Sequence, residues 1–455
     1  MASYTAASGK RIAGGRDIYP DATLDLIDAA ASGGWVKLNA NLFSDAWPPS
    51  GLQTPLTPQR IITPWSSFAW DTKRHGLWLW GGGHANYSGN DVYFWSAVTR
   101  QWSLAFHTST VARGTSAAAS DGDGVIFAAS DNPHSPLSSH TYDSNVYLPI
   151  LDRFVTFGGA GQGLALAFGV FENEQRLRFL AGYKLQLGLA GQGYLGGLAG
   201  FNYQGSGYEN VQLPGARAWE PIDWYLDNPT MPTTLRNKLN CGCAYEMQGG
   251  KDTVFLTISG ISSRAMFHAV FEDQDYRNDV ITRVSGATGF NGGGQGTLAL
   301  DKDKRVLVEV LDTDTTAKFQ FIDLKRTWGT GNEWYSVESF SGDSGVVADF
   351  IASRTTRSGM DYDPVRQELV IWEKGPKVWA LQVPTGDPTP TTGWTVYRRD
   401  NGTGDAPVDS WPLSQSGTHG KWKYAPDLDA FVGLIHPENG DVWAWKPSGW
   451  LDPRL

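Results

Sequence analysis

The sequence contains the segment Phe68-Ala-Trp-Asp71-Thr-Lys-Arg-His-Gly-Leu-Trp-Leu-Trp80, in which an aromatic strand, an acid, a short polar turn and a second apolar strand follow one another. A related order returns five more times, anchored at Tyr142, Tyr245, Leu300, Tyr362 and Tyr424. Recurring hairpins at a spacing of this size are typical of the blades of a β-propeller.

Several copies continue with a third strand, such as Asp441-Val-Trp-Ala-Trp445, and with a fourth that carries a Trp, such as Trp102. The last copy reaches Gly449-Trp450 with almost no chain left for a fourth strand, whereas residues 34–38 have the right pattern to supply it. We therefore expect an all-β fold, a single β-propeller of six or seven four-stranded blades, closed by its N-terminal strand.

The repeat also predicts the organisation of the chain. Residues 1–33 would form an N-terminal arm and residues 34–455 the propeller, with an insertion at 160–212 in the second blade. The blades would start near residues 67, 140, 243, 297, 359 and 421. A seventh blade would have to lie between His107 and Ser139.

Composition narrows the function classes. The 455 residues include 54 Gly and 20 Trp, only 18% are charged, and the formal net charge is −10. Nucleic acids and anionic membranes are bound by clustered Lys and Arg, so we expect no specific nucleic-acid binding. No run of 18 apolar residues occurs, which predicts no membrane span, and the first residues do not have the pattern of a secretory signal peptide.

A family resemblance rests on the third strand and its turn. Gly81-Gly-Gly-His84, Tyr87, Asn90-Asp-Val-Tyr93, Thr99 and Trp102 resemble a kelch motif, whose hallmarks are a diglycine, a spaced Tyr and a later Trp. Later copies lack the diglycine, so the chain resembles degenerate kelch-type, galactose-oxidase-like propellers. The resemblance implies the fold, but propellers host many unrelated activities.

Loop lengths indicate which face of the propeller carries the functional site. The turns between first and second strands are short, whereas the loops at 107–139, 213–240, 336–358 and 398–419 are long. Binding usually resides on long loops of a rigid scaffold, so we expect the site on this long-loop face. A polar residue on such a loop can also have a purely structural role, in which its side chain only hydrogen-bonds to the backbone of the turn. The candidate binding residues are His84, Asn86, Tyr87, His140, Arg357, His419 and His436.

No residue pattern indicates a cofactor. Galactose oxidases hold copper with two Tyr and two His and cross-link one Tyr to a Cys. The eight His here are scattered, and Cys241-Gly-Cys243 does not match that context. We therefore expect neither a metal nor a cofactor.

Two functions remain open. The first is enzymatic: some bacterial propellers with a Gly-Gly-Gly-His turn resemble polysaccharide lyases. His84 and Tyr87 would then share acid and base duties, while Arg264 or Arg357 neutralises the uronate carboxylate. The absence of a signal peptide argues against this alternative, because such enzymes usually meet polymers outside the cytoplasm.

The second, favoured function is a non-enzymatic structural protein of a bacteriophage virion, since several tail hub and nozzle proteins resemble β-propellers. An uncharged run, Leu185 to Tyr208, would be an arm that binds other tail subunits or further copies of the chain. The protein would then reside in the virion, with a host-surface polysaccharide as an additional ligand. Whether such a glycan is bound or cleaved stays open from the sequence.

Overall fold

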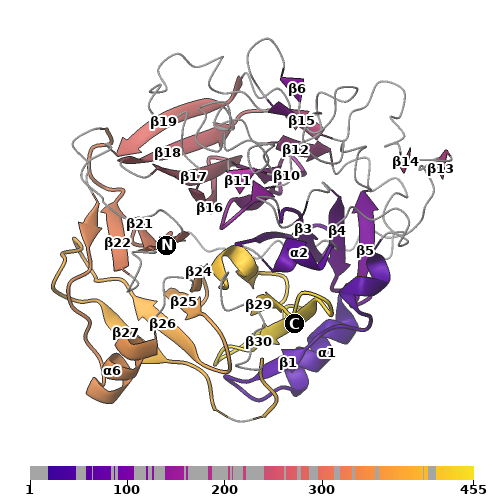
Figure 1. Ribbon diagram of the computed structural model, residues 1–455. Coiled ribbons are helices and arrows are strands. Elements are labelled where there is room, and N and C mark those ends of the chain that lie inside the picture. The colour runs from indigo at the N-terminus through magenta and orange to yellow at the C-terminus, as the bar shows by residue number, and fades with distance from the viewer. Residues whose placement is uncertain are drawn as a thin grey trace.

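The computed structural model is a ring of antiparallel sheets (Figure 1). It describes residues 19–47, 58–63, 65–82, 87, 91–106, 119–120, 126–127, 139–157, 160–161, 183–186, 203–204, 207–208, 219–221, 240–260, 263–273, 278–285, 296–311, 318–329, 334–353, 358–402, 404–407 and 417–455. In these ranges, six sheets have four strands each. The expected all-β propeller of four-stranded blades is confirmed.

Five of these sheets have described side chains on all four strands. The first joins β2 (Phe68–Asp71), β3 (Gly76–Leu79), β4 (Val92–Ser96) and β5 (Gln101–Phe106). The third joins β16 (Asn240–Gln248), β17 (Lys251–Gly260), β18 (Ser263–Phe271) and β19 (Val280–Ser285). The fourth joins β20 (Gly296–Asp301), β21 (Val306–Leu311), β22 (Lys318–Asp323) and β23 (Tyr335–Ser336).

The fifth and sixth sheets come from the C-terminal part of the chain. The fifth joins β24 (Gly359–Asp363), β25 (Glu368–Trp372), β26 (Val378–Gln382) and β27 (Thr395–Arg398). The sixth joins β28 (Trp422–Ala425), β29 (Ala430–Ile435), β30 (Asp441–Trp445) and the distant β1 (Trp35–Lys37). We number the blades in this order.

The second sheet joins β9 (Asn145–Leu148), β10 (Arg153–Thr156), β12 (Tyr183–Gln186) and β15 (Trp219–Pro221). Only its two inner strands, β9 and β10, have described side chains. Short pairs accompany the blades: β6 (Ala119–Ser120) with β7 (Ile126–Phe127), β8 (Ser139–His140) with β11 (Ala160–Gly161), and β13 (Tyr203–Gln204) with β14 (Gly207–Tyr208). Of residues 107–138, where the sequence left room for a seventh blade, the structure describes only β6 and β7.

The helical elements are short and lie outside the sheets. Among the described residues they are α1 (Asp21–Ala29), α2 (Gln59–Ile62), α6 (Ser344–Ser353) and the 3-10 turns η1 (Phe43–Ala46) and η6 (His419–Lys421). Contacts between the innermost strands run from β2 to β9, β16, β20, β24 and β28, and β28 contacts β2 again. The inner strands therefore form one closed ring.

One repeat of the sequence is placed differently from our expectation. The sequence pattern anchors the second copy at Tyr142, but the inner strand starts only at Asn145, and Tyr147 takes the anchor position. The Tyr147 hydroxyl donates to Asp152 at 2.7 Å, as the Tyr424 hydroxyl donates to Asp429 at 2.7 Å in blade 6. Tyr142 therefore precedes the blade and has another role.

The turns between first and second strands share one backbone feature. Each contains a left-handed residue, which is His75, Asp152, Arg305, Gln367 or Asp429 in five blades and Gly249 with Gly250 in blade 3. Left-handed backbone lets a short turn reverse the chain between two twisted strands. In three turns the acid that ends the first strand also caps backbone N–H groups: Asp71, Asp301 and Asp363.

The N-terminal strand closes the ring, as the sequence predicted. Trp35 pairs with Trp445, and Lys37 with Trp443, so β1 is the outer strand of blade 6. The Trp35 ring lies 5.2 Å from the Trp372 ring and 5.5 Å from the Trp422 ring, which joins the closing strand to blades 5 and 6.

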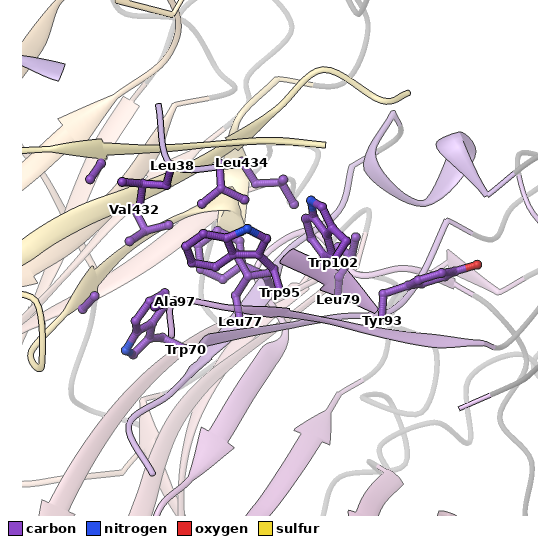
Figure 2. Close-up of a cluster of buried hydrophobic side chains, with 14 of the residues drawn as sticks. Leu38, Trp70, Leu77, Leu79, Tyr93, Trp95, Ala97, Trp102, Val432 and Leu434 are labelled. Atoms are coloured by element: carbon purple, nitrogen blue, oxygen red, sulfur yellow. The ribbon is translucent and has the colours of Figure 1, made fainter. Parts of the chain in front are cut away.

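A large hydrophobic core lies where the two ends of the ring meet. Figure 2 shows Leu38, Val432 and Leu434 of blade 6 and its closing strand facing Trp70 and Trp95 of blade 1. Helix α1 contributes Leu24 and Ile27 to the same cluster. The closure therefore rests on apolar packing in addition to strand pairing.

The segment expected to form an arm lies mainly outside the described residues. Between residues 185 and 208 the structure describes only the backbone of 185–186, 203–204 and 207–208. Its role in assembly stays a prediction.

We expect Trp35→Ala to destabilise the protein by about 3–5 kcal/mol, because it removes a buried indole from the closing strand. Lys37→Ala, on the same strand with a half-exposed side chain, should cost less than about 1 kcal/mol. Urea unfolding followed by circular dichroism checks both variants. Equal losses would show that the closing strand does not depend on its buried indole.

Candidate functional site

Residues 140–145, the axial segment, cross the centre of the ring between blade 1 and β9. The Tyr142 N–H donates to Trp65 O at 2.7 Å, and Tyr142 O accepts from Gly420 N–H at 2.9 Å. Asp143 O accepts from Cys243 N–H at 2.9 Å. The backbone of the axial segment thus bonds to chain next to the inner strands of blades 1 and 6 and to β16 of blade 3.

The Asp143 side chain adds further ties across the centre. It is fully buried, its Oδ1 lies 2.5 Å from Lys423 Nζ, and its Oδ2 accepts from the Leu298 N–H at 3.0 Å. Burial raises the pKa of Asp143 to about 6, although the Lys423 ammonium opposes this shift. Burial lowers the pKa of Lys423, but the charges of Asp143 and Asp361 outweigh it and leave that pKa raised.

Glycine is required where η6 meets the axial segment. A Cβ on Gly420 would lie 2.3 Å from Ser67 Cβ and 2.6 Å from Asp143 Oδ1, distances that no side chain tolerates. The residues that precede Asp143 and Gly420 have left-handed backbone: φ is +48° at Tyr142 and +44° at His419. Non-glycine residues in this conformation are strained and persist only where surrounding contacts hold them.

Two of the expected binding residues come together here. The ring of Tyr142 lies 6.0 Å from that of His140 and 6.2 Å from that of His419, edge-on to both. The Trp65 ring packs against His140, with 4.8 Å between the two ring centres. His140 and His419 are both buried, so they pack inside the ring instead of lining an open surface.

A lysine next to this cluster is also enclosed. Lys421 is fully buried, and its Nζ donates to Ile62 O at 3.1 Å. Burial lowers the pKa of Lys421 to about 7, because a low-polarity surrounding disfavours the ammonium form.

The other expected site residues do not join this cluster in the described structure. Tyr87 is buried, and its hydroxyl donates to Asp91 Oδ1 at 2.7 Å. His436 is a left-handed turn residue whose Nδ1 accepts from the Asn439 N–H. His84, Asn86 and Arg357 lie outside the described residues, and of Arg264 only the backbone in β18 is described.

The axial residues Asp143, Lys423 and Lys421, together with Tyr142, were not expected as a cluster. A partial signal existed in Lys423, a charge within the inner strand β28, whereas Lys421 lies just before that strand, at the end of η6. For Asp143 the sequence was misleading, since Tyr142-Asp143 matches the acid-ended repeat.

The polar side chains at the centre of the ring contact other residues of the same chain. Within the described ranges, no group of three or more His, Cys, Asp or Glu residues could hold a metal ion. No helix among the described residues is long and apolar enough to span a membrane. The buried polar groups of the axis contact other parts of the chain, which suits a rigid centre.

Comparisons with known proteins add little to this geometry. No protein-family model matches the chain, and no curated protein matches it, so kelch stays a resemblance. Among solved structures, the chain is similar to an auxiliary nutrient binding protein from Bacteroides thetaiotaomicron VPI-5482, with 10% sequence identity and a TM-score of 0.39. That match covers 89% of this chain and 75% of the other. A likeness at this level assigns neither fold nor function.

We expect Lys423→Met to destabilise the protein by about 3–5 kcal/mol near pH 8, because it leaves the Asp143 carboxylate buried without its cation. The pKa of Asp143 is higher in the folded than in the unfolded chain, so protonation favours folding. Lys423 holds this pKa down, so the pKa of Asp143 rises further above about 6 in the variant. The loss should therefore grow as the pH rises above about 6 and be smallest at about pH 5–6, where Asp143 is protonated in both proteins.

Urea unfolding between about pH 5 and pH 8 measures this change. Lys374→Met is the matched control, since Lys374 is exposed, and its effect should be small at each pH. A loss for Lys423→Met that does not depend on pH would contradict the assignment to the Asp143 charge.

Proposed function

We propose that the chain is a non-enzymatic propeller that serves as a rigid structural and binding subunit. One observation carries this proposal: the ionisable groups gathered at the axis are buried and bonded to the chain itself. Asp143, Lys421 and His419 are each fully buried, whereas a catalytic acid or base must reach its substrate. Ligand contacts would then come from the long-loop face, with a surface polysaccharide as the ligand class.

The setting that we propose is a bacteriophage tail. Support comes from the sequence: a net charge of −10, a Trp-rich propeller and the uncharged run at 185–208 suit a subunit that packs against neighbours. The virion as location and homo-oligomer formation through residues 185–208 belong to the same proposal.

Sedimentation velocity on the purified chain tests the assembly. We expect an oligomer, and we expect a variant with residues 187–202 replaced by a short Gly-Ser linker to sediment as a monomer, because the uncharged run is then lost. An unchanged circular dichroism spectrum controls for folding of the blades. A native chain that is monomeric at every concentration would contradict this part of the proposal.

Incubation with uronate polymers tests the absence of lyase activity. We expect binding without any rise in ultraviolet absorbance from unsaturated products, because Tyr87 is buried and already donates to Asp91. The alternative function, a polysaccharide lyase, would give that rise and would lose it in His84→Ala. Such a result would overturn the non-enzymatic proposal.

A further inference from the structure

Ion pairs connect neighbouring blades on the face that carries the short turns. Arg74 of blade 1 makes two bonds of 2.7 and 2.9 Å to Asp152 of blade 2. Arg366 of blade 5 makes the same fork to Asp429 of blade 6, at 2.9 and 2.7 Å. Arg305 of blade 4 pairs with Glu246 of blade 3. Since arginine stays protonated, these ties do not change at ordinary pH.

The junction between blades 6 and 1 uses a histidine instead. His75 Nδ1 lies 2.5 Å from Asp427 Oδ2, and the side chains of these residues are 19% and 12% exposed. The other oxygen of Asp427 accepts from the Trp70 indole at 2.5 Å. Blades 6 and 1 are thus joined through one carboxylate that contacts a titratable partner.

Both ends of the described chain meet at this junction. The Tyr19 ring lies 5.7 Å from the His75 ring, and the Tyr19 hydroxyl donates to Pro453 O at 3.2 Å. Thr23 of α1 donates to Ala97 O, and the Ala97 N–H donates to His75 O at 2.7 Å. The turn of His75 therefore supports the N-terminal helix and the last residues as well as blade 6.

We propose that His75 and Asp427 form a pH-sensitive clasp on the closure of the ring. Protonated His75 holds the blade 6 turn and the segment from Tyr19 through α1 against blade 1. Loss of that proton weakens the ion pair, and the closing segment, α1 with β1, becomes the first part of the ring to open as pH rises.

The charges around the clasp set its direction. His75 faces Asp427 from blade 6, Asp71 from its own turn and Tyr19 from the N-terminal segment, which in turn lies near Asp452 and Asp21. Burial lowers the pKa of His75, but the hydrogen bond and charge of Asp427 outweigh it, so this pKa lies above 6.5. On the His75 side the stabilisation is therefore complete below pH 6.5 and is lost as pH rises through the higher pKa of the folded state. Burial raises the pKa of Asp427, so the pair is also lost at acidic pH, where this carboxylate becomes protonated.

The chain offers matched replacements for His75. Arg305 and Gln367 occupy the same turn position in blades 4 and 5, with φ values of +58° and +54°, close to the +51° of His75. His75→Arg should keep a permanent cation in the clasp, and His75→Gln should keep a hydrogen-bonding side chain without charge.

Hydrogen exchange measured by mass spectrometry on the full chain tests the clasp. Native chain, His75→Arg and His75→Gln are compared at each pH between about 5.5 and 8.5, so that the intrinsic pH dependence of exchange cancels. Peptides from residues 20–38 report the closing segment. Peptides from residues 296–323 in blade 4 serve as the internal control.

We expect protection of residues 20–38 in the native chain, relative to His75→Arg, to fall by about twofold to fivefold as pH rises, the range for a partly exposed ion pair. His75→Gln should match the native chain at high pH and lie below it at low pH. Blade 4 peptides should not change in either comparison. Identical pH dependence in the native chain and His75→Arg, or an equal change in blade 4, would overturn the proposal.

Discussion

The ring depends on one buried carboxylate at its centre. Asp143 pairs with Lys423 of blade 6, accepts from the Leu298 N–H of blade 4, and bonds through its own carbonyl to Cys243 of blade 3. Because these groups are out of water, their attraction is weakly screened, but an unpaired member would be costly. The blades are thus joined at the axis by polar contacts and at the closure by strand pairing and apolar packing.

Much of the fold could be predicted because its signals are short in range. An acid, a tight turn and two flanking apolar strands lie within about 13 residues at Phe68–Trp80, and the repeats inherit the pattern. The closing strand is also predictable, because the last copy lacks a fourth strand and residues 34–38 have the pattern of one. The predicted anchor of the second copy is wrong because Tyr142-Asp143 matches the repeat locally. The left-handed backbone at Tyr142, which takes this residue out of the strand, has no sequence signature.

The candidate site shows a similar division. Position before an inner strand was enough to bring His140 and His419 to the same end of the axis, where both contact Tyr142. Their burial could not be predicted, since it depends on the axial segment crossing the ring. Long-range contacts of this kind, such as Asp143 with Lys423, join residues 280 positions apart and follow from topology instead of local pattern.

The pairing of β1 with β30 also has a consequence during protein synthesis. Trp35 leaves the ribosome 410 residues before its partner Trp445. At about 5–20 residues per second, that first strand waits on the order of 20–80 s without a sheet to join. For most of this interval, until Trp372 and then Trp422 are synthesised, Trp35 also lacks the indole partners that it has in the folded ring. The nascent chain therefore exposes an aromatic strand to chaperones.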